Sequence, residues 1–153
     1  MKIIYKRGDA LAGPEYFLAH GCNNKGKMGA GIAQQIRTKY KPAYDYYTEV
    51  YNTNTLELGA VLGVKCASKY IFNCITQDGY GRGGKKYLVD EAVAACMLEI
   101  SQQLKQLVPQ VLIHNIEVAM PQIGAGLAAG DWNLIEKIIE QNSLFQPVVY
   151  IYE

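Results

Sequence analysis

The sequence predicts one α/β domain in which helices cover both faces of a mixed β-sheet. Short apolar runs rich in β-branched residues alternate along the chain with longer segments whose apolar residues recur at helical spacing. The 153 residues are enough for one domain with a proper core and too few for two comfortable ones. We therefore expect residues 1–153 to form a single three-layer α/β/α sandwich with a mixed central sheet.

The first half of the chain is expected to contain four strands and two helices. In order, these are strands at 2–6 and 16–20, helices at 31–40 and 42–51, and strands at 60–66 and 70–75. The strand at 2–6 is expected at an edge of the sheet, where the chain enters it. The last two strands are separated only by the short turn 67–69, which predicts a hairpin.

The second half begins with a loop at 76–85, which has no periodicity and holds four glycines. The clearest helix of the chain is expected at 88–107, where apolar residues keep helical spacing. A strand at 116–120, a helix at 133–141 and a strand at 148–152 complete the pattern.

Composition excludes several classes of function. Half of the residues are apolar, 19% are charged and the net charge is +1, which predicts an ordered protein without the basic surface typical of nucleic-acid or anionic-membrane binding. No apolar stretch approaches the roughly 20 residues of a membrane span, and we expect a cytoplasmic protein. The four cysteines lack CxxC spacing and only two histidines are present, so neither a metal site nor a disulfide framework is expected.

Two glycine-rich segments are the most informative motifs, and each lies between a strand-like run and a helix-like run. The first covers residues 20–33 and the second residues 120–132. Glycine lets the backbone approach a ligand closely and adopt positive φ, so that successive N–H groups converge on an anion. A helix that starts directly after such a loop adds its unpaired N–H groups and the positive end of its dipole. Two such loops in one small domain predict a diphosphate held from both sides.

Three loops are expected to meet in one cleft. In open α/β sheets, ligands bind in a crevice at the carboxyl ends of the strands. Both glycine-rich segments follow strands and precede helices, and the loop at 76–85 does the same.

In this order and spacing, the motifs resemble those of the macro domain family, ADP-ribose-binding α/β/α modules, over essentially the whole chain. Gly8-Asp9 after the first strand resembles the family's adenine-recognising Gly-Asp. The first glycine-rich segment resembles the first phosphate and distal-ribose loop, residues 121–127 resemble the diphosphate-binding loop, and Val149-Tyr150 matches the closing strand. The resemblance implies a single macro domain at 1–153 that uses no cofactor.

The resemblance implies ligand contacts in five places along the chain. These are Gly8, Asp9 and Ala10; Gly21, Cys22, Met28, Gly29, Ala30, Gly31 and Ile32; Gln77; Pro121, Gln122, Ile123, Gly124, Ala125, Gly126 and Leu127; and Tyr150. The implied ligand is ADP-ribose or ADP-ribose 1″-phosphate, with an ADP-ribosylated protein as a further candidate partner.

Within the family, the chain resembles the subgroup that holds ADP-ribose 1″-phosphate phosphatases and the terminal ADP-ribose protein glycohydrolase. The glycohydrolase branch uses a lysine after the Ile-Thr that corresponds to Ile75-Thr76, at the start of the loop at 76–85. It also uses an aspartate after the Gly-Leu that corresponds to Gly126-Leu127, in the second glycine-rich segment. This chain has Gln77 and Ala128 there, so neither the covalent adduct nor its acid–base partner can form. His20 matches the histidine of the phosphatase branch.

Three residues are candidates for catalysis, and each could instead serve the structure. His20, with an ordinary pKa of about 6.5, can protonate a leaving oxygen or orient water, or it can be a core histidine at a strand end. Asn23 can contact a ribose hydroxyl or shape a turn, and Asp131 can act as an acid or cap the helix that follows.

Two interpretations also remain for the residues expected at the two ends of the ligand. Asp9 can bind adenine or cap a turn, and Tyr150 can stack on adenine or be a core aromatic. Arg82 and the nearby lysines can reach a terminal phosphate or form a solvated loop.

The function expected from these features is hydrolysis of ADP-ribose 1″-phosphate to ADP-ribose and phosphate. The alternatives are a non-catalytic reader of ADP-ribose or ADP-ribosyl protein, and a de-ADP-ribosylating hydrolase. A dinucleotide-dependent dehydrogenase is set aside, because no strand ends in Asp or Glu ~20 residues after the glycine turn.

Overall fold

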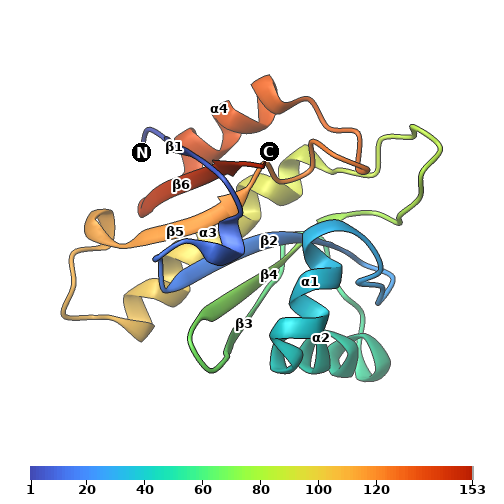
Figure 1. Ribbon diagram of the computed structural model, residues 1–153, viewed down its shortest axis with the longest axis horizontal. Helices are drawn as coiled ribbons and strands as arrows, with labels where there is room; N and C mark the ends of the chain where they lie inside the picture. The colour runs from blue at the N-terminus through green and yellow to red at the C-terminus, as the bar shows by residue number, and fades with distance from the viewer. Residues whose placement is uncertain (153) are drawn as a thin grey trace.

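The structure of the protein, a computed structural model, describes residues 1–152 and contains one central sheet between two layers of helices (Figure 1). The strands are β1 (Ile4–Arg7), β2 (Phe17–Asn23), β3 (Val61–Lys65), β4 (Tyr70–Gln77), β5 (Glu117–Pro121) and β6 (Gln146–Ile151). The helices are α1 (Gly31–Lys39), α2 (Lys41–Thr53), α3 (Asp90–Leu107) and α4 (Trp132–Asn142), with short 3₁₀ helices η1 (Ala10–Ala12) and η2 (Ile113–Asn115).

The sheet is mixed, with strand order β1-β6-β5-β2-β4-β3. All neighbours pair in parallel except β3 and β4, which are antiparallel. The predicted hairpin and the edge position of the first strand are therefore confirmed. Because β5, β2 and β4 run in one direction, their carboxyl ends lie at the same edge of the sheet.

Side chains alternate between the two faces of the sheet, and each face packs against its own pair of helices. Residues such as Ala19 on β2 and Phe72 on β4 belong to the cluster that also contains the buried residues of α3 and α4. Their neighbours Leu18 and Ile71 join Ile36 of α1 and Ala43 of α2 on the other face. The predicted three-layer α/β/α sandwich is confirmed, and Figure 1 shows α1 and α2 on the near face with α3 behind the sheet.

Two boundaries differ from the sequence prediction for identifiable reasons. The second strand continues past His20 to Asn23, and β4 continues through Thr76 to Gln77, which forms a β-bridge with Leu88. Hydrogen bonding with neighbouring strands extends both elements into segments that glycine content had marked as loop. The two 3₁₀ helices have three residues each, too short for a periodic signal.

His20 lies in the core between the sheet and α2. Its side chain is 0% exposed, and its Nε2 donates to Oδ1 of Asn73 at 2.6 Å. The Asn73 amide in turn donates to the carbonyl of Ala43 on α2 at 3.1 Å. Burial lowers the pKa of His20 to about 4. Of the two interpretations of His20, the core histidine is the correct one, because strand alternation turns its side chain toward the face that α2 covers.

We expect His20 to make stability depend on pH. Its folded-state pKa of about 4 is below the unfolded value of about 6.5, so the unfolded state binds more protons between these pH values. Stability should fall as the pH drops through this window, by on the order of 3 kcal/mol at most. Urea unfolding at several pH values measures the effect.

The only other histidine, His114, is exposed and gives a matched control. His114→Gln should keep the wild-type pH dependence between pH 7 and 4, whereas His20→Gln should be less stable at pH 7 and show a shallower decline. An unchanged slope in His20→Gln would contradict the assignment.

Candidate functional site

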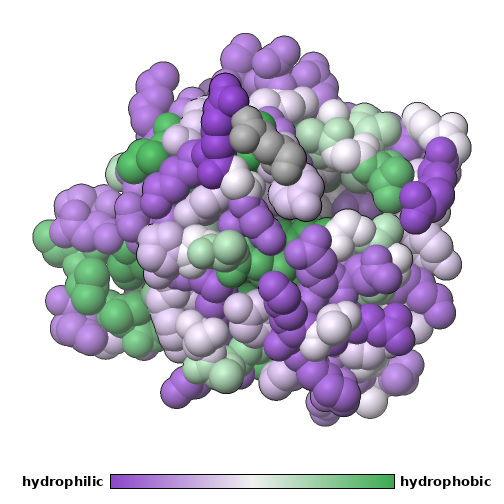
Figure 2. All heavy atoms as spheres, in the orientation of Figure 1, coloured by the Kyte–Doolittle hydropathy of each residue, from purple (hydrophilic) through white to green (hydrophobic). Residues whose placement is uncertain are grey.

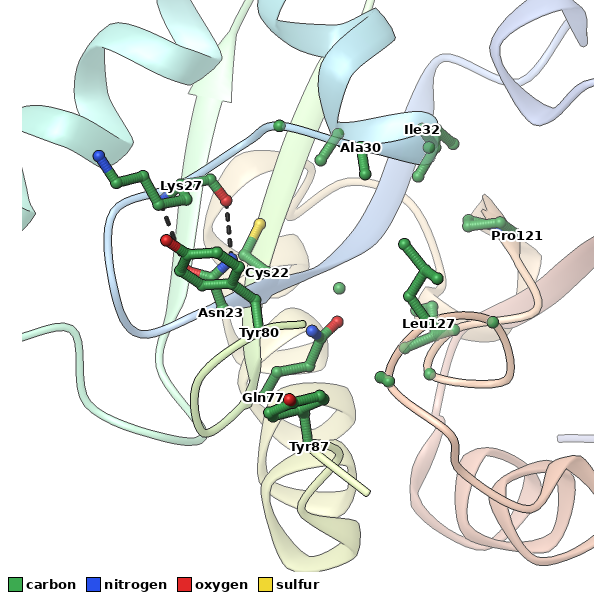
Figure 3. A pocket seen from close by; sticks show the side chains of 18 of the residues that line it. Cys22, Asn23, Lys27, Ala30, Ile32, Gln77, Tyr80, Tyr87, Pro121 and Leu127 are labelled. Carbon is green, nitrogen blue, oxygen red and sulfur yellow. Dashed lines mark hydrogen bonds between the residues drawn. The ribbon is translucent and has the colours of Figure 1, made fainter. Parts of the chain in front are cut away.

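A cleft of about 380 Å³ opens at the sheet edge where β2, β4 and β5 end (Figure 3). It is lined by residues 21–23, 27, 29–33, 77, 80–82, 87, 121–124 and 126–128. These residues come from the three loops predicted to meet there.

The first loop runs from β2 into α1 and leaves the start of that helix open to a ligand. Ala30 is the N-cap residue of α1 and its side chain makes no cap hydrogen bond. Gly31, the first helical residue, has φ +58° and lines the cleft. The first-turn N–H groups of a helix have no partners within the helix, so an anion can bind them.

The second loop follows β5 and folds back on itself. The N–H of Gly130 donates to the carbonyl of Gly124 at 2.7 Å, which closes the segment into a ring-like turn. Gly124 has φ +76°, and Ala129 has φ 59°, the only positive φ of a non-glycine residue among those described. Positive φ costs free energy at alanine, so the hydrogen bonds around this turn must hold it in place.

Hydrogen bonds tie the three loops to one another. Asn24 of the first loop donates its backbone N–H to Gln77 and accepts from the N–H of Gly79 through its side chain, both at 3.0 Å. In the second loop, the carbonyl of Ala128 accepts from the N–H groups of Tyr87 and Leu88. The predicted convergence of the loops is confirmed.

A smaller cavity of about 270 Å³ continues the cleft toward β1 and β6. It shares Gly31, Ile32 and Pro121 with the main cleft, so the two form one elongated groove. Its other lining residues are Gly8, Asp9, Ala10, Gln35, Tyr150 and Tyr152.

Asp9 and Tyr150 are held firmly in this smaller cavity. One carboxylate oxygen of Asp9 accepts from the N–H of Leu11 at 2.9 Å and caps η1, so the capping role is confirmed. The Tyr150 hydroxyl donates to buried Glu15 at 2.8 Å, and Lys6 pairs with the second oxygen of Glu15 at 2.7 Å. Burial, followed by the bond to Glu15, raises the pKa of Tyr150.

The opposite end of the groove, which we call the terminal end, is lined by Asn23, Lys27, Gln77, Tyr80, Arg82 and Tyr87. In Figure 3 the Gln77 amide lies between the rings of Tyr80 and Tyr87, and Asn23 is hydrogen-bonded to Lys27. Lys27 and Arg82 are the basic residues of this lining, and Figure 3 shows the Lys27 side chain extending away from the centre of the cleft. No described residue lining the main cleft is a carboxylate or a histidine. The face of the molecule in the space-filling view is mixed, with hydrophilic and apolar side chains interspersed (Figure 2).

Most residues implied as ligand contacts line the groove, and their contacts stay predictions. These are Gly8, Asp9, Ala10, Gly21, Cys22, Gly29, Ala30, Gly31, Ile32, Gln77, Pro121, Gln122, Ile123, Gly124, Gly126, Leu127 and Tyr150.

Met28 and Ala125 do not line the groove. Met28 is 1% exposed and packs in the core cluster of Cys22, Tyr47 and Leu56, so its side chain points away from the groove. The N–H of Ala125 closes a turn onto Gln122 at 3.2 Å.

Two of the three candidate catalytic residues are also outside the groove. His20 is in the core, and Asp131 accepts from the N–H of Asn133 at 3.0 Å as the N-cap of α4. The capping interpretation of Asp131 is therefore the correct one. Asn23 does line the terminal end.

The groove is also lined by residues for which the sequence motifs predicted no contact, namely Lys27, Ala33, Gln35, Tyr80, Gly81, Tyr87, Ala128 and Tyr152. Tyr80 lies in the third loop, at 76–85, and Tyr87 lies directly after it. The position of this loop after β4 was the sequence signal that could have predicted their contact with the ligand. Gln35 follows Gly31 by one helical turn and so shares its face of α1.

Among residues 1–152, no group of three or more His, Cys, Asp or Glu side chains is arranged to hold a metal ion. Within the same range, no helix has the length and apolar character needed to cross a membrane.

Curated relatives align along the full length of the chain. An ADP-ribose 1″-phosphate phosphatase of Lodderomyces elongisporus is 28% identical, with 100% of both chains covered. An uncharacterised 17.5 kDa protein of Enterobacteria phage T4 is 31% identical over 99% of this chain and 96% of its own. A DNA ADP-ribosyl glycohydrolase of Thermus aquaticus is 24% identical over 97% of this chain and 40% of its own length.

Solved structures share the fold. A protein of unknown function from Bacteroides thetaiotaomicron is 30% identical and superposes with a TM-score of 0.83 over 99% of this chain and 98% of its own. The DarTG protein of Thermosipho africanus, solved with ADP-ribose, has a TM-score of 0.79 at 15% identity, over 99% of this chain and 42% of its own.

The family model described as "Macro domain" matches residues 19–139, which include all three cleft loops and the strands that carry them. The chain belongs to the macro domain family.

Proposed function

We propose that the protein binds ADP-ribose 1″-phosphate in the groove and hydrolyses it to ADP-ribose and inorganic phosphate. The observation that carries this proposal is the charge at the terminal end, where Lys27 and Arg82 line the cleft and no described carboxylate does. A ligand that ends in a phosphate is attracted to such an end. The full-length relatives named ADP-ribose 1″-phosphate phosphatase support the same substrate.

The groove offers a suitable environment for each part of this substrate. We place the adenine in the smaller cavity, beside the Asp9 carboxylate and the Tyr150 ring, whose hydroxyl is held by Glu15. The diphosphate then lies between the start of α1 and the second loop, where backbone N–H groups can hold it. The distal ribose and the 1″-phosphate reach the terminal end.

Hydrolysis needs little covalent chemistry from the protein. Water attacks the phosphorus, the bond from phosphorus to the C1″ oxygen breaks, and a proton from the water goes to that oxygen, which becomes the 1″-hydroxyl. In phosphoryl transfer, positioning and stabilisation of charge on the oxygens supply most of the catalysis. Arg82, together with Lys27 after a change of its side-chain rotamer, is the candidate for that role, whereas His20 and Asp131 are not.

A non-catalytic reader of ADP-ribosyl groups is the second candidate, and one observation favours it. Both polar atoms of the Asn23 side chain are engaged by the protein's own loop, so Asn23 has little capacity left to activate water. Gln77 and Ala128 replace the lysine and aspartate that the resemblance implies for the glycohydrolase branch, which weakens the de-ADP-ribosylating alternative, whereas the relative named DNA ADP-ribosyl glycohydrolase supports it.

Phosphate release tests the reaction directly. Wild-type protein should liberate inorganic phosphate from ADP-ribose 1″-phosphate, and Lys27→Ala or Arg82→Ala should each lower kcat/KM about tenfold, because a partly exposed contact between a cation and phosphate contributes ~1–1.5 kcal/mol. Lys105→Ala, an exposed charge removal on α3, is the control and should match wild type. Absence of release by the wild type, with tight ADP-ribose binding, would establish the reader instead.

Glycine variants test where the diphosphate binds. A Cβ added to Gly29 or Gly126 meets no atom within 4 Å, and both residues line the cleft. Gly29→Val and Gly126→Val should therefore fold normally and bind ADP-ribose at least tenfold more weakly in calorimetric titrations. Gly124→Val should instead lose stability, because its φ is +76° and the new side chain would overlap Leu88. Wild-type affinity in both open-site variants would place the diphosphate elsewhere.

Asp9→Asn tests adenine recognition without removing the helix cap. The amide oxygen can still accept from Leu11, but its NH₂ group cannot accept a hydrogen bond from the adenine amine. ADP-ribose affinity should fall about 10- to 100-fold, the scale for a hydrogen bond to a charged group. The hypoxanthine analogue, which presents a carbonyl there, should lose less affinity. Equal losses for both ligands would assign Asp9 to capping alone.

A further inference from the structure

We propose that Tyr47 of α2 is a positioning residue, which holds Asn23 and the backbone of the first loop in place at the terminal end of the groove, where the terminal phosphate of the substrate binds. The inference rests on the proposed function for its substrate, and it assigns part of the site's geometry to a helix that does not line the groove.

The Tyr47 side chain is 0% exposed and contacts Asn23, the last residue of β2. Its hydroxyl donates to the backbone carbonyl of Asn23 at 2.6 Å and lies 3.0 Å from the Asn23 side-chain oxygen. Burial raises the pKa of Tyr47, so the hydroxyl keeps its proton and stays a donor throughout the ordinary pH range.

Asn23 passes this constraint on to Lys27. The Asn23 side-chain oxygen accepts from the N–H of Lys25 at 2.9 Å and from that of Lys27 at 3.4 Å. Its amide nitrogen donates to the carbonyl of Lys27 at 2.7 Å, the bond drawn in Figure 3. Both backbone polar groups of Lys27 are thus held by one side chain, which Tyr47 holds in turn.

A second tyrosine of α2 contacts the same loop one helical turn later. The ring of Tyr51 lies so close to Gly26 that a Cβ at this glycine would overlap it, and Gly26 has φ +76°. Two side chains at i and i+4 share one helix face, so α2 supports the loop at two points.

This arrangement separates terminal-phosphate recognition from binding of the rest of the ligand. The smaller cavity and the second loop make no use of Tyr47. Loss of the Tyr47 hydroxyl should therefore disturb Asn23 and the backbone of residues 25–27, and leave the adenosine and diphosphate contacts intact. A role confined to stability would instead affect both ligands alike.

Tyr47→Phe keeps the buried ring and removes only the hydroxyl. We expect kcat/KM for phosphate release from ADP-ribose 1″-phosphate to fall about tenfold, while the Kd of ADP-ribose changes less than twofold. Hydrogen exchange at the amides of Lys25 and Lys27 should accelerate. Tyr46→Phe, an exposed neighbour on the same helix, is the matched control and should behave as wild type.

The outcomes separate this inference from the proposed function. If the wild type releases no phosphate, ADP-ribose 1″-phosphate is a stable ligand, and the same comparison is made between its Kd and that of ADP-ribose. Equal losses for the two ligands, or unchanged amide exchange at Lys27, would overturn the positioning role whether or not the protein is a phosphatase. Should Tyr47→Phe fold poorly, Tyr51→Leu tests the second support and should shift the same ratio in the same direction.

Discussion

The parallel pairing of β5, β2 and β4 is the constraint on which the groove depends. Because these strands run in one direction, the loops that follow them leave the sheet at one edge and lie next to one another there. Asn24 joins the first loop to the third, and Ala128 joins the second to the third. The groove is therefore the space between loops that are already braced against one another, and little ordering remains to be done when a ligand arrives.

Local sequence signals were sufficient to place the strands, the four α-helices and the loops of the groove along the chain, but not the ends of β2 and β4. Both glycine-rich loops were located from their glycine content and from the change of apolar spacing from period 2 to helical spacing. This worked because the residues of these loops themselves determine the backbone conformation there. The same signals misplaced His20, because the strand was expected to end at that residue. In fact β2 continues to Asn23, and alternation along a strand decides which face each side chain takes. Met28 was expected to contact the ligand because it lies in a glycine-rich loop, but its apolar side chain packs into the core instead.

The contacts that hold Tyr150 and Asn23 in place in the groove could not be predicted from the sequence, because each joins residues far apart in the chain. The Tyr150 ring is held by Glu15, which is 135 residues away, and Lys6 completes that network from β1. Tyr47 of the helix α2 donates to Asn23 of the strand β2, which is 24 residues earlier in the chain. No local pattern marks a tyrosine as the donor to a particular carbonyl. Even so, the buried carboxylate of Glu15 needs both of its partners, because an unpaired charge in that position would be costly.

The groove divides recognition between two kinds of group, and this explains why a reader and a phosphatase can share one fold. At the diphosphate, the available donors are backbone N–H groups, which almost any side-chain replacement leaves unchanged. At the terminal end, the donors that we propose are side chains, Arg82 and Lys27, and a single substitution removes each of them. The net charge of +1 means that the chain as a whole provides little attraction for an anion, so these two cations act locally. Binding of ADP-ribose therefore belongs to the fold, whereas the choice between retaining and hydrolysing its terminal group belongs to a few side chains and to the helix α2 that holds the loop carrying one of them.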